Sequence, residues 1–339
     1  MELKVSDIGE FELIGRIQKI IDAGGNKPGL LVHGIGDDTA VFSPEPGHEI
    51  LVTCDSMVEG RHYLKEYITP FEIGRRAMVM NISDIGAMGG KVLYAFVTLG
   101  LTSSQSVNDI EEIYRGFISE LKPLGASIAG GNMTKADGTP FIDITLIGAA
   151  KKEYLALRSG AGPGDSIMIT GCPGQSAAGY WLFKNKINES EQTRSLFDSY
   201  LRPMHRAMEG HALAISGKIT SMIDLSDGLS GDLFHICEKS LVGAEIKEES
   251  LPVSKALEAF AALYEKKATD YVLGASDDYE LLFTCRPENM QAVKSILSDL
   301  SCPVIYIGNI VPLAQGVNIV TKDGEQKALI KKGWDHFSK

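Results

Sequence analysis

Aspartates next to glycines and other small residues recur along this chain, and their chemistry is that of cation ligands. Gly34-Ile35-Gly36-Asp37-Asp38-Thr39 joins two glycines, which allow a tight turn, to two adjacent carboxylates. Adjacent carboxylates repel each other unless a cation lies near them, and hard oxygen ligands suit Mg²⁺ or Ca²⁺. One such stretch is equally consistent with a solvated turn. Recurrence favours a metal site, because similar clusters occur at Thr53-Cys54-Asp55, Asn81-Ile82-Ser83-Asp84, Ile223 to Gly228 and Asp277 to Glu280.

The strongest single constellation is Asp224-Leu225-Ser226-Asp227-Gly228. On a strand-to-helix turn, Asp224, Ser226 and Asp227 could converge on a cation, while Gly228 would leave room for a phosphate. Asp227 could instead be a helix N-cap, although that interpretation leaves Asp224 unexplained.

Familiar nucleotide and catalytic signatures are missing from the sequence. It contains no GxxxxGK[ST], HExxH, GxSxG or HRD motif, and Gly34-Ile35-Gly36 lacks the third glycine of a dinucleotide fingerprint. His62 lies beside Arg61 and soon after Asp55, where a cationic pair could meet an anion. We interpret the dispersed His33, His205, His211 and His235 as structural. The residues therefore predict a metal-dependent enzyme acting on polyanions, and phosphoryl transfer fits because it depends on positioning and charge neutralisation.

Composition restricts the class of protein. The 339 residues favour two domains, and the net charge of −11 argues against a nucleic-acid surface. Five scattered cysteines without a CxxC pair indicate reduced thiols. No apolar run is long enough to span a membrane, and Met1 to Lys4 leads into acidic sequence without a signal-like apolar region. We therefore expect a cytoplasmic protein with no membrane or nucleic-acid partner.

The expected elements bring several of these residues to the ends or faces of strands and helices. A strand over 49–55 delivers Asp55 to its end. Thr69 and Glu72 form a capping box with Pro70 between them, which predicts a helix to about Met88. On that helix Met80, Asp84 and Met88 share one stripe, so Asp84 needs a partner if it is buried.

The remaining pattern predicts an α/β alternation. The clearest helix is expected at 107–122, and the stretches 126–130 and 141–147 are expected to pair around a polar turn at 131–138. A helix is expected over 203–216 with Pro203 at its start. The Gly-rich junction 149–164 separates an N-terminal domain, 1–150, from a C-terminal domain, 151–339.

Several motifs, in order, resemble those of the thiamine-monophosphate kinase family, within the larger group that includes aminoimidazole ribonucleotide synthetase, selenophosphate synthetase and the hydrogenase-maturation ATPase. They are Gly34 to Asp38, Asp55 to His62, Asn81 to Gly89, Arg158 to Asp165, Ile223 to Gly228, Asp278 to Leu281 and Gly333 to Phe337. The resemblance implies a two-domain α/β fold like that of aminoimidazole ribonucleotide synthetase. It also implies a homodimer in which the N-terminal sheets form a shared β-barrel, each followed by a C-terminal α/β domain.

The resemblance also assigns roles to residues. It implies Mg²⁺-binding positions at Asp38, Thr53, Cys54 (through its backbone), Asp55, Asp84, Asn132, Asp224 and Asp227. It implies ATP contacts at Gly131, Asn132, Arg158 and Ser226, and contacts to thiamine monophosphate at His62, Asp277 and Trp334.

The implied reaction converts ATP and thiamine monophosphate to ADP and thiamine diphosphate, with several Mg²⁺ ions. The acceptor is a phosphate oxygen that is already anionic near pH 7, so no general base is required. Two alternatives stay open: another ATP-dependent member of the group, of the hydrogenase-maturation type, and a non-catalytic nucleotide-binding relative.

The sequence departs from the family pattern in three respects. Asn132 stands where Asp is usual, so one metal ligand loses its charge. Asp277 replaces a usual Glu and Ala275-Ser276 a glycine pair, which changes the expected substrate contacts. Cys54 replaces a common Thr, which matters little if its carbonyl is the ligand.

Overall fold

The computed structural model describes residue 3 and residues 5–24, 30–33, 41–42 and 45–333. The chain divides into two compact units, here called unit 1 and unit 2. Unit 1 comprises Met1–Ile85 and Gly90–Glu153, and unit 2 comprises Gly86–Gly89 and Tyr154–Lys339. Among the described residues, no helix combines the length and apolar character needed to cross a membrane.

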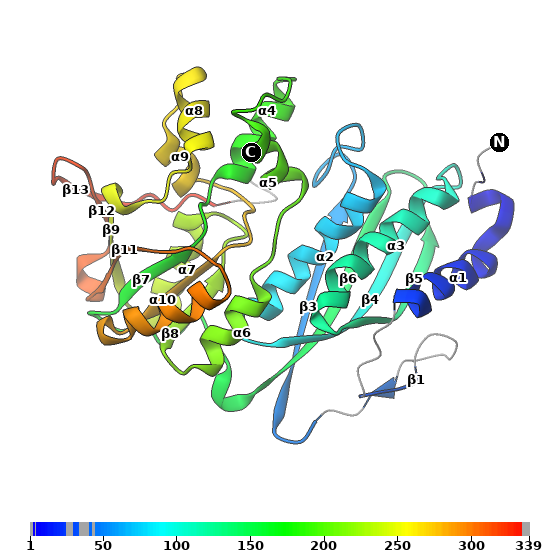
Figure 1. Cartoon of the computed structure of the whole chain (residues 1–339), viewed down its shortest axis with the longest axis horizontal. Coiled ribbons are helices and arrows are strands. Elements are labelled where there is room, and N and C mark those ends of the chain that lie inside the picture. The colour runs from blue at the N-terminus through cyan, green and yellow to red at the C-terminus, as the bar shows by residue number, and fades with distance from the viewer. Residues whose placement is uncertain (1–2, 4, 25–29, 34–40, 43–44, 334–339) are drawn as a thin grey trace. The chain divides into compact units, whose positions relative to one another are not determined.

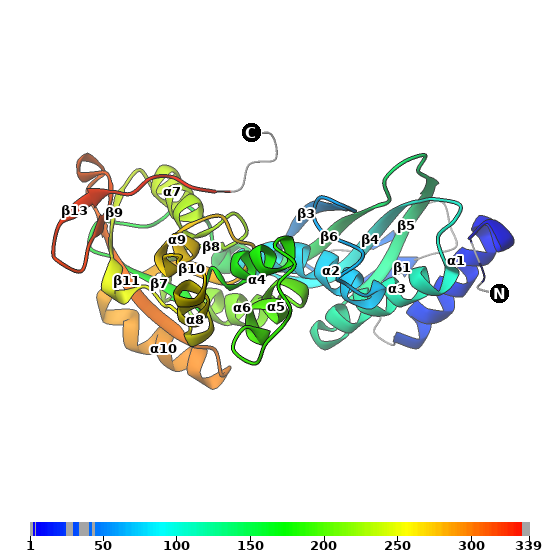
Figure 2. The ribbon, with the colours of Figure 1, turned by 90° about the horizontal axis from the view of Figure 1, so that it is seen from above.

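Unit 1 contains a four-stranded sheet in the order β3-β6-β4-β5 (Figure 1). The β4–β5 pair is parallel, whereas β6 runs antiparallel to both of its neighbours. Helices α2 and α3 cover one face of this sheet (Figure 2). The elements of this part of the chain are α1 (Val5–Gly24), β1 (Leu31–His33), β2 (Val41–Phe42), β3 (His48–Val58), α2 (Pro70–Ala87), β4 (Lys91–Leu101), α3 (Val107–Leu121), β5 (Ser127–Lys135) and β6 (Phe141–Lys151).

The predicted start of α2 is confirmed in detail. The backbone N–H of Thr69 donates to Glu72 Oε2 at 2.9 Å, and the N–H of Glu72 donates to Thr69 Oγ1 at 3.3 Å. This reciprocal capping box satisfies N–H groups that a helix otherwise leaves unpaired. The helix expected at 107–122 is also confirmed, with Ile110, Ile113 and Phe117 among its buried residues.

The hairpin expected between 126–130 and 141–147 is wrong. Strand β4 lies between β5 and β6, and β5 continues through the supposed turn as far as Lys135. The parallel partner β4 explains the difference, because it supplies hydrogen bonds to a polar stretch that looks like a turn in the sequence. Gly131 and Asn132 are therefore strand residues.

Unit 2 is built on a seven-stranded mixed sheet, in the order β13-β12-β9-β11-β7-β10-β8. Helix α7 lies on one side of this sheet and α10 on the other (Figure 2). Its elements are β7 (Ser166–Thr170), α4 (Gln175–Lys184), α5 (Arg194–Leu201), α6 (Ala207–Ile215), β8 (Ile219–Asp224), α7 (Leu229–Ser240), β9 (Gly243–Lys247), α8 (Lys255–Leu263), α9 (Ala268–Leu273), β10 (Leu281–Cys285), α10 (Met290–Asp299), β11 (Val304–Val311), β12 (Val317–Val320) and β13 (Gln326–Ala328). Short 3₁₀ helices occupy Lys122–Leu124, Lys152–Tyr154, Glu248–Ser250, Pro287–Asn289 and Leu313–Gln315.

The core of unit 2 follows the period-two pattern of its strands. Phe283 on β10 pairs in register with Met168 on β7 and Met222 on β8, and all three are buried against Leu213 and Leu297 of α6 and α10. The helix expected over 203–216 begins later than predicted, at Ala207.

Candidate functional site

Two of the predicted positions lie outside the described residues. They are Asp38, in the first Gly-Asp stretch, and Trp334, near the C-terminus. The other predicted residues fall into unit 1 or unit 2, and each group is described separately.

In unit 1, strand β3 and helix α2 bring Thr53 to Asp84. The Thr53 hydroxyl donates to Asp84 Oδ2 at 2.5 Å. Helix α2 is buried almost throughout, but Met80 and Asp84, which share a stripe, are only half-buried. Asp55 lies two residues after Thr53 on β3, so its side chain points to the same face of the sheet. The structure thus brings Thr53, Asp55 and Asp84 to the helix-covered face.

An unsatisfied acceptor lies one helical turn before Asp84. Asn81 is completely buried, and its Nδ2 donates to the carbonyl of Ala77 at 3.2 Å. Its Oδ1 has no hydrogen-bond partner among the described residues. A buried acceptor without a partner costs about 1–3 kcal/mol, so its retention one helical turn before Asp84 fits a site that receives a cation or a donor. The oxygen-only donor set of this face is the kind that Mg²⁺ prefers.

Cys54 and Asn132 have their side chains on the opposite face of the same sheet. Cys54 Sγ lies 3.5 Å from Asp143 Oδ1, and Asn132 pairs in register with Thr98, which pairs with Asp143. Because residues opposite each other in a ladder share a face, the Asn132 amide points away from Asp84. Cys54 could reach the Asp84 side only through its backbone carbonyl, as the family resemblance implies.

Gly131 occupies a position that excludes any side chain. A Cβ added there would lie 2.0 Å from the carbonyl oxygen of Val97 on the neighbouring strand. The close approach of the two backbones explains why a glycine occupies this position.

His62 is held by the turn that follows β3. The backbone N–H of Val58 donates to His62 Nδ1 at 2.9 Å, so Nδ1 is an acceptor and the ring proton resides on Nε2. The imidazole therefore presents an N–H donor at Nε2.

In unit 2, Asp224 ends β8 and is 2% exposed. The turn after it is fixed by two backbone hydrogen bonds, from Leu225 N–H to the Glu280 carbonyl and from Tyr279 N–H to the Leu225 carbonyl, both 2.8 Å. Gly228 has φ +111°, and a Cβ there would lie 2.0 Å from the Gly274 carbonyl oxygen. These contacts hold the Asp224 to Gly228 turn beside the segment that carries Asp277.

Asp232 and His235 belong to the same cluster, and sequence reasoning did not assign them to it. Among the described residues, Asp227, Asp232 and His235 each offer one ligand atom, and these atoms lie within 4.8 Å of one another. Asp232 also accepts the N–H of Gly228 at 3.1 Å, so the cap at the start of α7 comes from Asp232 and not from Asp227. The spacing of Asp232 and His235, three residues apart on one helix, is the signal that could have found them.

The electrostatics of this cluster fit a cation. Burial, and then the charges of Asp224 and Asp227, raise the pKa of Asp232 to about 8. Burial, followed by the charges of Lys331 and Arg158, lowers the pKa of His235, so that its ring is neutral at pH 7. Crowded carboxylates next to a neutral imidazole are the ligands that a divalent cation would stabilise.

Arg158 lies in a loop fastened to the far end of α7. Ser240 Oγ donates to the Arg158 carbonyl at 3.1 Å and accepts the N–H of Ala161 at 3.2 Å. Asp165, which is 7% exposed, closes the loop by accepting from Gly162 N–H and Thr220 Oγ1. The exposed Arg158 guanidinium is close enough to His235 to influence its pKa, which places it near the acidic cluster.

The acidic run Asp277 to Glu280 serves mainly the fold. Asp278 accepts the N–H groups of Gly174 and Ser176 at the start of α4, at 2.6 and 3.1 Å. Glu280 pairs with Arg206. Asp277 accepts from Ser176 Oγ at 2.5 Å and is half-buried, so it is the member of this run nearest to a role in binding.

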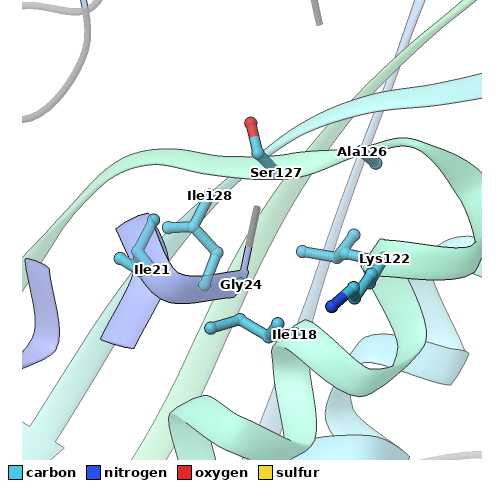
Figure 3. A pocket seen from close by; sticks show the side chains of 8 residues that line it. Ile21, Gly24, Ile118, Lys122, Ala126, Ser127 and Ile128 are labelled. Carbon is cyan, nitrogen blue, oxygen red and sulfur yellow. The ribbon is translucent and has the colours of Figure 1, made fainter. Parts of the chain in front are cut away.

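A small apolar cavity in unit 1 is unrelated to these residues. Figure 3 shows Ile21 of α1, Ile118 of α3 and Ile128 of β5 pointing towards one another around it. Its lining contains no carboxylate, so it is a packing seam and not a site for a metal or a nucleotide.

Comparison with known proteins identifies the family. Residues 36–150 match the N-terminal domain of AIR synthase related proteins, and residues 162–319 match the C-terminal domain. The thiamine-monophosphate kinase of Buchnera aphidicola subsp. Acyrthosiphon pisum is 34% identical over 333 residues, covering 97% of this chain and 98% of the relative. The chain belongs to the thiamine-monophosphate kinase family. The family assignment made from the ordered motifs is therefore confirmed.

Solved structures agree with this assignment to the thiamine-monophosphate kinase family. The crystal structure of thiamine-monophosphate kinase from Stenotrophomonas maltophilia K279a has a TM-score of 0.82 and 30% identity, covering 94% of this chain and 98% of that one. A structure of AaThiL complexed with AMPPCP and TMP has a TM-score of 0.76 and 31% identity, covering 99% of both chains. The predicted two-domain α/β fold of the aminoimidazole ribonucleotide synthetase type, with mixed sheets, is confirmed.

Proposed function

We propose that this chain transfers the γ-phosphoryl group of ATP to thiamine monophosphate and releases thiamine diphosphate and ADP. The observation that carries the proposal is the full-length likeness to thiamine-monophosphate kinases, one of which is solved with AMPPCP and TMP. The acidic residues of unit 1 and those of unit 2 each carry oxygen ligands of the kind that such a reaction uses.

In this proposal Thr53, Asp55, Asp84, Asp224 and Asp227 would hold Mg²⁺, together with Asp38 and the Cys54 carbonyl. Asn132, predicted as a further ligand, is left out of this set because its amide lies on the opposite face of the sheet from Asp84. Bound Mg²⁺ supplies positive charge that neutralises the phosphates. The Thr53 hydroxyl orients the Asp84 carboxylate by donating to Oδ2, and Asp232 fixes the Asp227 turn by accepting the Gly228 N–H.

Other residues of the chain bind the nucleotide and the acceptor in this proposal. Gly131, Asn132, Arg158 and Ser226 contact ATP, whereas His62, Asp277 and Trp334 contact thiamine monophosphate. Because His62 presents an N–H at Nε2, it donates to an anionic phosphate oxygen and does not remove a proton. The acceptor oxygen is already ionised near pH 7, so the site needs no general base, and none of the described groups is required as one.

We also propose that the chain works as a cytoplasmic homodimer. The face of the unit 1 sheet opposite α2 and α3 carries Val52, 63% exposed, followed on β3 by the exposed Cys54 and Ser56. Pairing of two such faces would close the shared β-barrel implied by the family. Residues 1–150 then serve nucleotide binding and dimerisation, and residues 151–339 contribute to the substrate site.

An assay of the purified chain with thiamine monophosphate, ATP and Mg²⁺, which reads thiamine diphosphate by chromatography, tests the activity. We expect product and ADP in equal amounts, and no product when EDTA replaces Mg²⁺. Binding of Mg²⁺·ATP without ADP release would favour a non-catalytic relative. ADP release without thiamine diphosphate would favour another enzyme of the group.

A further inference from the structure

The short segment before strand β10 is bonded to the first turn of helix α4. Ser276 Oγ accepts the N–H of Ala177 at 3.2 Å. Asp278 accepts the N–H groups of Gly174 and Ser176 at 2.6 and 3.1 Å. These bonds satisfy N–H groups that the start of a helix otherwise leaves unpaired, so they belong to the fold.

A further bond between the same two segments joins side chain to side chain. Ser176 is completely buried, and its Oγ donates to Asp277 Oδ1 at 2.5 Å. Asp277 is only half-buried, so it is partly accessible from solvent. The start of α4 does not need this bond, because the backbone N–H of Ser176 already donates to Asp278. Its effect is to fix one carboxylate oxygen of Asp277 and with it the orientation of the whole group.

The segment that carries Asp277 also lies against the acidic turn after β8. The N–H of Tyr279 donates to the Leu225 carbonyl at 2.8 Å, and a Cβ added at Gly228 would lie 2.9 Å from Ala275 Cα. Tyr279 has φ +54°, in the left-handed region that large side chains rarely adopt. Backbone strain of this kind persists where the surrounding structure enforces it, often beside a binding site. The segment is thus held beside the turn to which the proposed function assigns Mg²⁺ ligands.

We propose that Ser176 is a positioning residue that orients the Asp277 carboxylate for binding the acceptor. This inference rests on the proposed function, which assigns Asp277 to thiamine monophosphate. Because a carboxylate repels a phosphate, Asp277 favours the part of the acceptor that carries positive charge, the thiazolium ring, or N–H donors. Ser176 is buried, so it acts on the acceptor only through Asp277.

A double-mutant cycle on stability tests the contact without any need for activity. Ser176→Ala removes only the hydroxyl, because the backbone N–H that donates to Asp278 is retained. The fall in Tm of the double variant Ser176→Ala/Asp277→Ala should be smaller than the sum of the two single losses, because each single variant leaves the other side chain without its partner in this bond. Losses that add up would overturn the contact.

Kinetics test the positioning role. Ser176→Ala should raise the KM for thiamine monophosphate about tenfold, with less than about a twofold change in the KM for ATP, because a hydrogen bond to a charged group is lost. In the Asp277→Ala background, Ser176→Ala should add nothing further. Equal changes in both KM values, or a further rise in the Asp277→Ala background, would overturn the proposal, because Ser176 would then act through the fold of α4.

Ser254→Ala is the matched control. Ser254 Oγ donates to Oε1 of Gln175, the first residue of α4, at 2.9 Å, and accepts the Leu257 N–H at 3.2 Å. Its loss should lower Tm, as the loss of a helix cap does, while both KM values stay within about twofold. A rise in the KM for thiamine monophosphate equal to that of Ser176→Ala would show that any loosening near α4 has the same effect, and it would overturn the role of Ser176.

Failure of the proposed function is distinguishable from failure of this inference. Absence of thiamine diphosphate formation by the unaltered chain would overturn the function and, with it, the acceptor role of Asp277. The cycle on stability would still decide whether Ser176 holds the Asp277 carboxylate. Product formation with an unchanged KM for thiamine monophosphate in Ser176→Ala would leave the function standing and overturn the inference alone.

Discussion

Arg206 and Glu280 form a two-pronged ion pair inside unit 2. Arg206 Nε lies 2.7 Å from Glu280 Oε2, and Nη2 lies 2.7 Å from Oε1, with side chains only 16% and 11% exposed. Thr170 Oγ1 donates to the same carboxylate at 2.5 Å. Burial alone would lower the pKa of the Arg206 guanidinium, but the hydrogen bonds and the charge of Glu280 raise it overall. The pair joins the start of α6 to the segment before β10.

Replacing one partner of this pair should destabilise the protein strongly. Glu280→Gln removes the carboxylate that pairs with Arg206 at two points and leaves the buried guanidinium only its longer contact with Glu209, at 3.4 Å, so we expect the free energy of unfolding to fall by about 3 kcal/mol. Urea denaturation followed by circular dichroism measures this change. The matched control is Asp198→Asn, which breaks the exposed Arg202–Asp198 pair at 2.6 Å and should cost less than about 1 kcal/mol. Equal losses of unfolding free energy in Glu280→Gln and Asp198→Asn would contradict the structural importance of the buried Arg206–Glu280 pair.

The carboxylates proposed to hold Mg²⁺ should be essential for turnover but not for folding. We expect Asp84→Asn and Asp224→Asn each to lower kcat at least about 100-fold, because neutral amides bind Mg²⁺ weakly. Both should also lose the rise in Tm that Mg²⁺·ATP gives the unaltered chain, while keeping its Tm in EDTA. Asp137→Asn, an exposed aspartate paired with Lys135, is the charge-matched control. Wild-type turnover in both site variants would refute the metal role.

The raised pKa of Asp278 predicts that the stability of the protein depends on pH. Burial raises the pKa of Asp278 to about 6, against the opposing effect of the Gly174 N–H and other hydrogen-bond donors. A raised pKa means that the folded state binds this proton more tightly than the unfolded state does. The stabilisation that this proton gives to the folded state is therefore fully present below about pH 4 and is lost as the pH rises through 6.

The comparison with Asp278→Asn isolates this effect. The difference in the free energy of unfolding between the unaltered chain and the variant should fall by roughly 2–3 kcal/mol from pH 4 to pH 7. Denaturant titrations at several pH values provide the measurement. A difference that stays constant over this range would show that Asp278 does not titrate there.

Gly228 should tolerate no side chain, for a reason beyond its backbone angle. Gly228→Ala places a Cβ against the Gly274 carbonyl at φ +111°, so we expect a loss of several kcal/mol and displacement of Asp227. Gly164 also has positive φ, +98°, but open space around it, so Gly164→Ala should cost only about 1 kcal/mol. Thermal unfolding of the two variants separates the steric collision of the new Cβ from the backbone strain of a positive φ. Equal losses of stability in Gly228→Ala and Gly164→Ala would argue against a collision.

The elements were predictable where local signals agreed. The capping box of Thr69 and Glu72, and the apolar face of α3, depend on residues within one or two helical turns, so the sequence reveals them directly. The placement of β4 between β5 and β6 depends on long-range pairing, which no local pattern encodes. That is why Gly131 and Asn132 looked like turn residues.

The candidate site also combines features with a local sequence signal and features that depend on long-range contacts. The acidic turn after β8 could be recognised from Asp224 and Asp227, but no local pattern favours Asp232 over Asp227 as the cap of α7. The same ambiguity made the run Asp277 to Glu280 resemble a cation site. Asp278 instead accepts backbone N–H groups at the start of α4. One of these donors, Ser176, precedes Asp278 by 102 residues, so only folding brings the two together.

The position of β7 inside the sheet of unit 2 has a consequence for biosynthesis. Both neighbours of β7, strands β10 and β11, lie far downstream, and Leu281 follows Thr170 by 111 residues. At roughly 5–20 residues per second, translation leaves this strand, all five residues of which are buried in the folded unit, without either neighbour for roughly 6–20 s. Nascent chains therefore expose two unpaired edges of a buried strand, which makes ribosome-associated chaperones the natural protection against aggregation during synthesis.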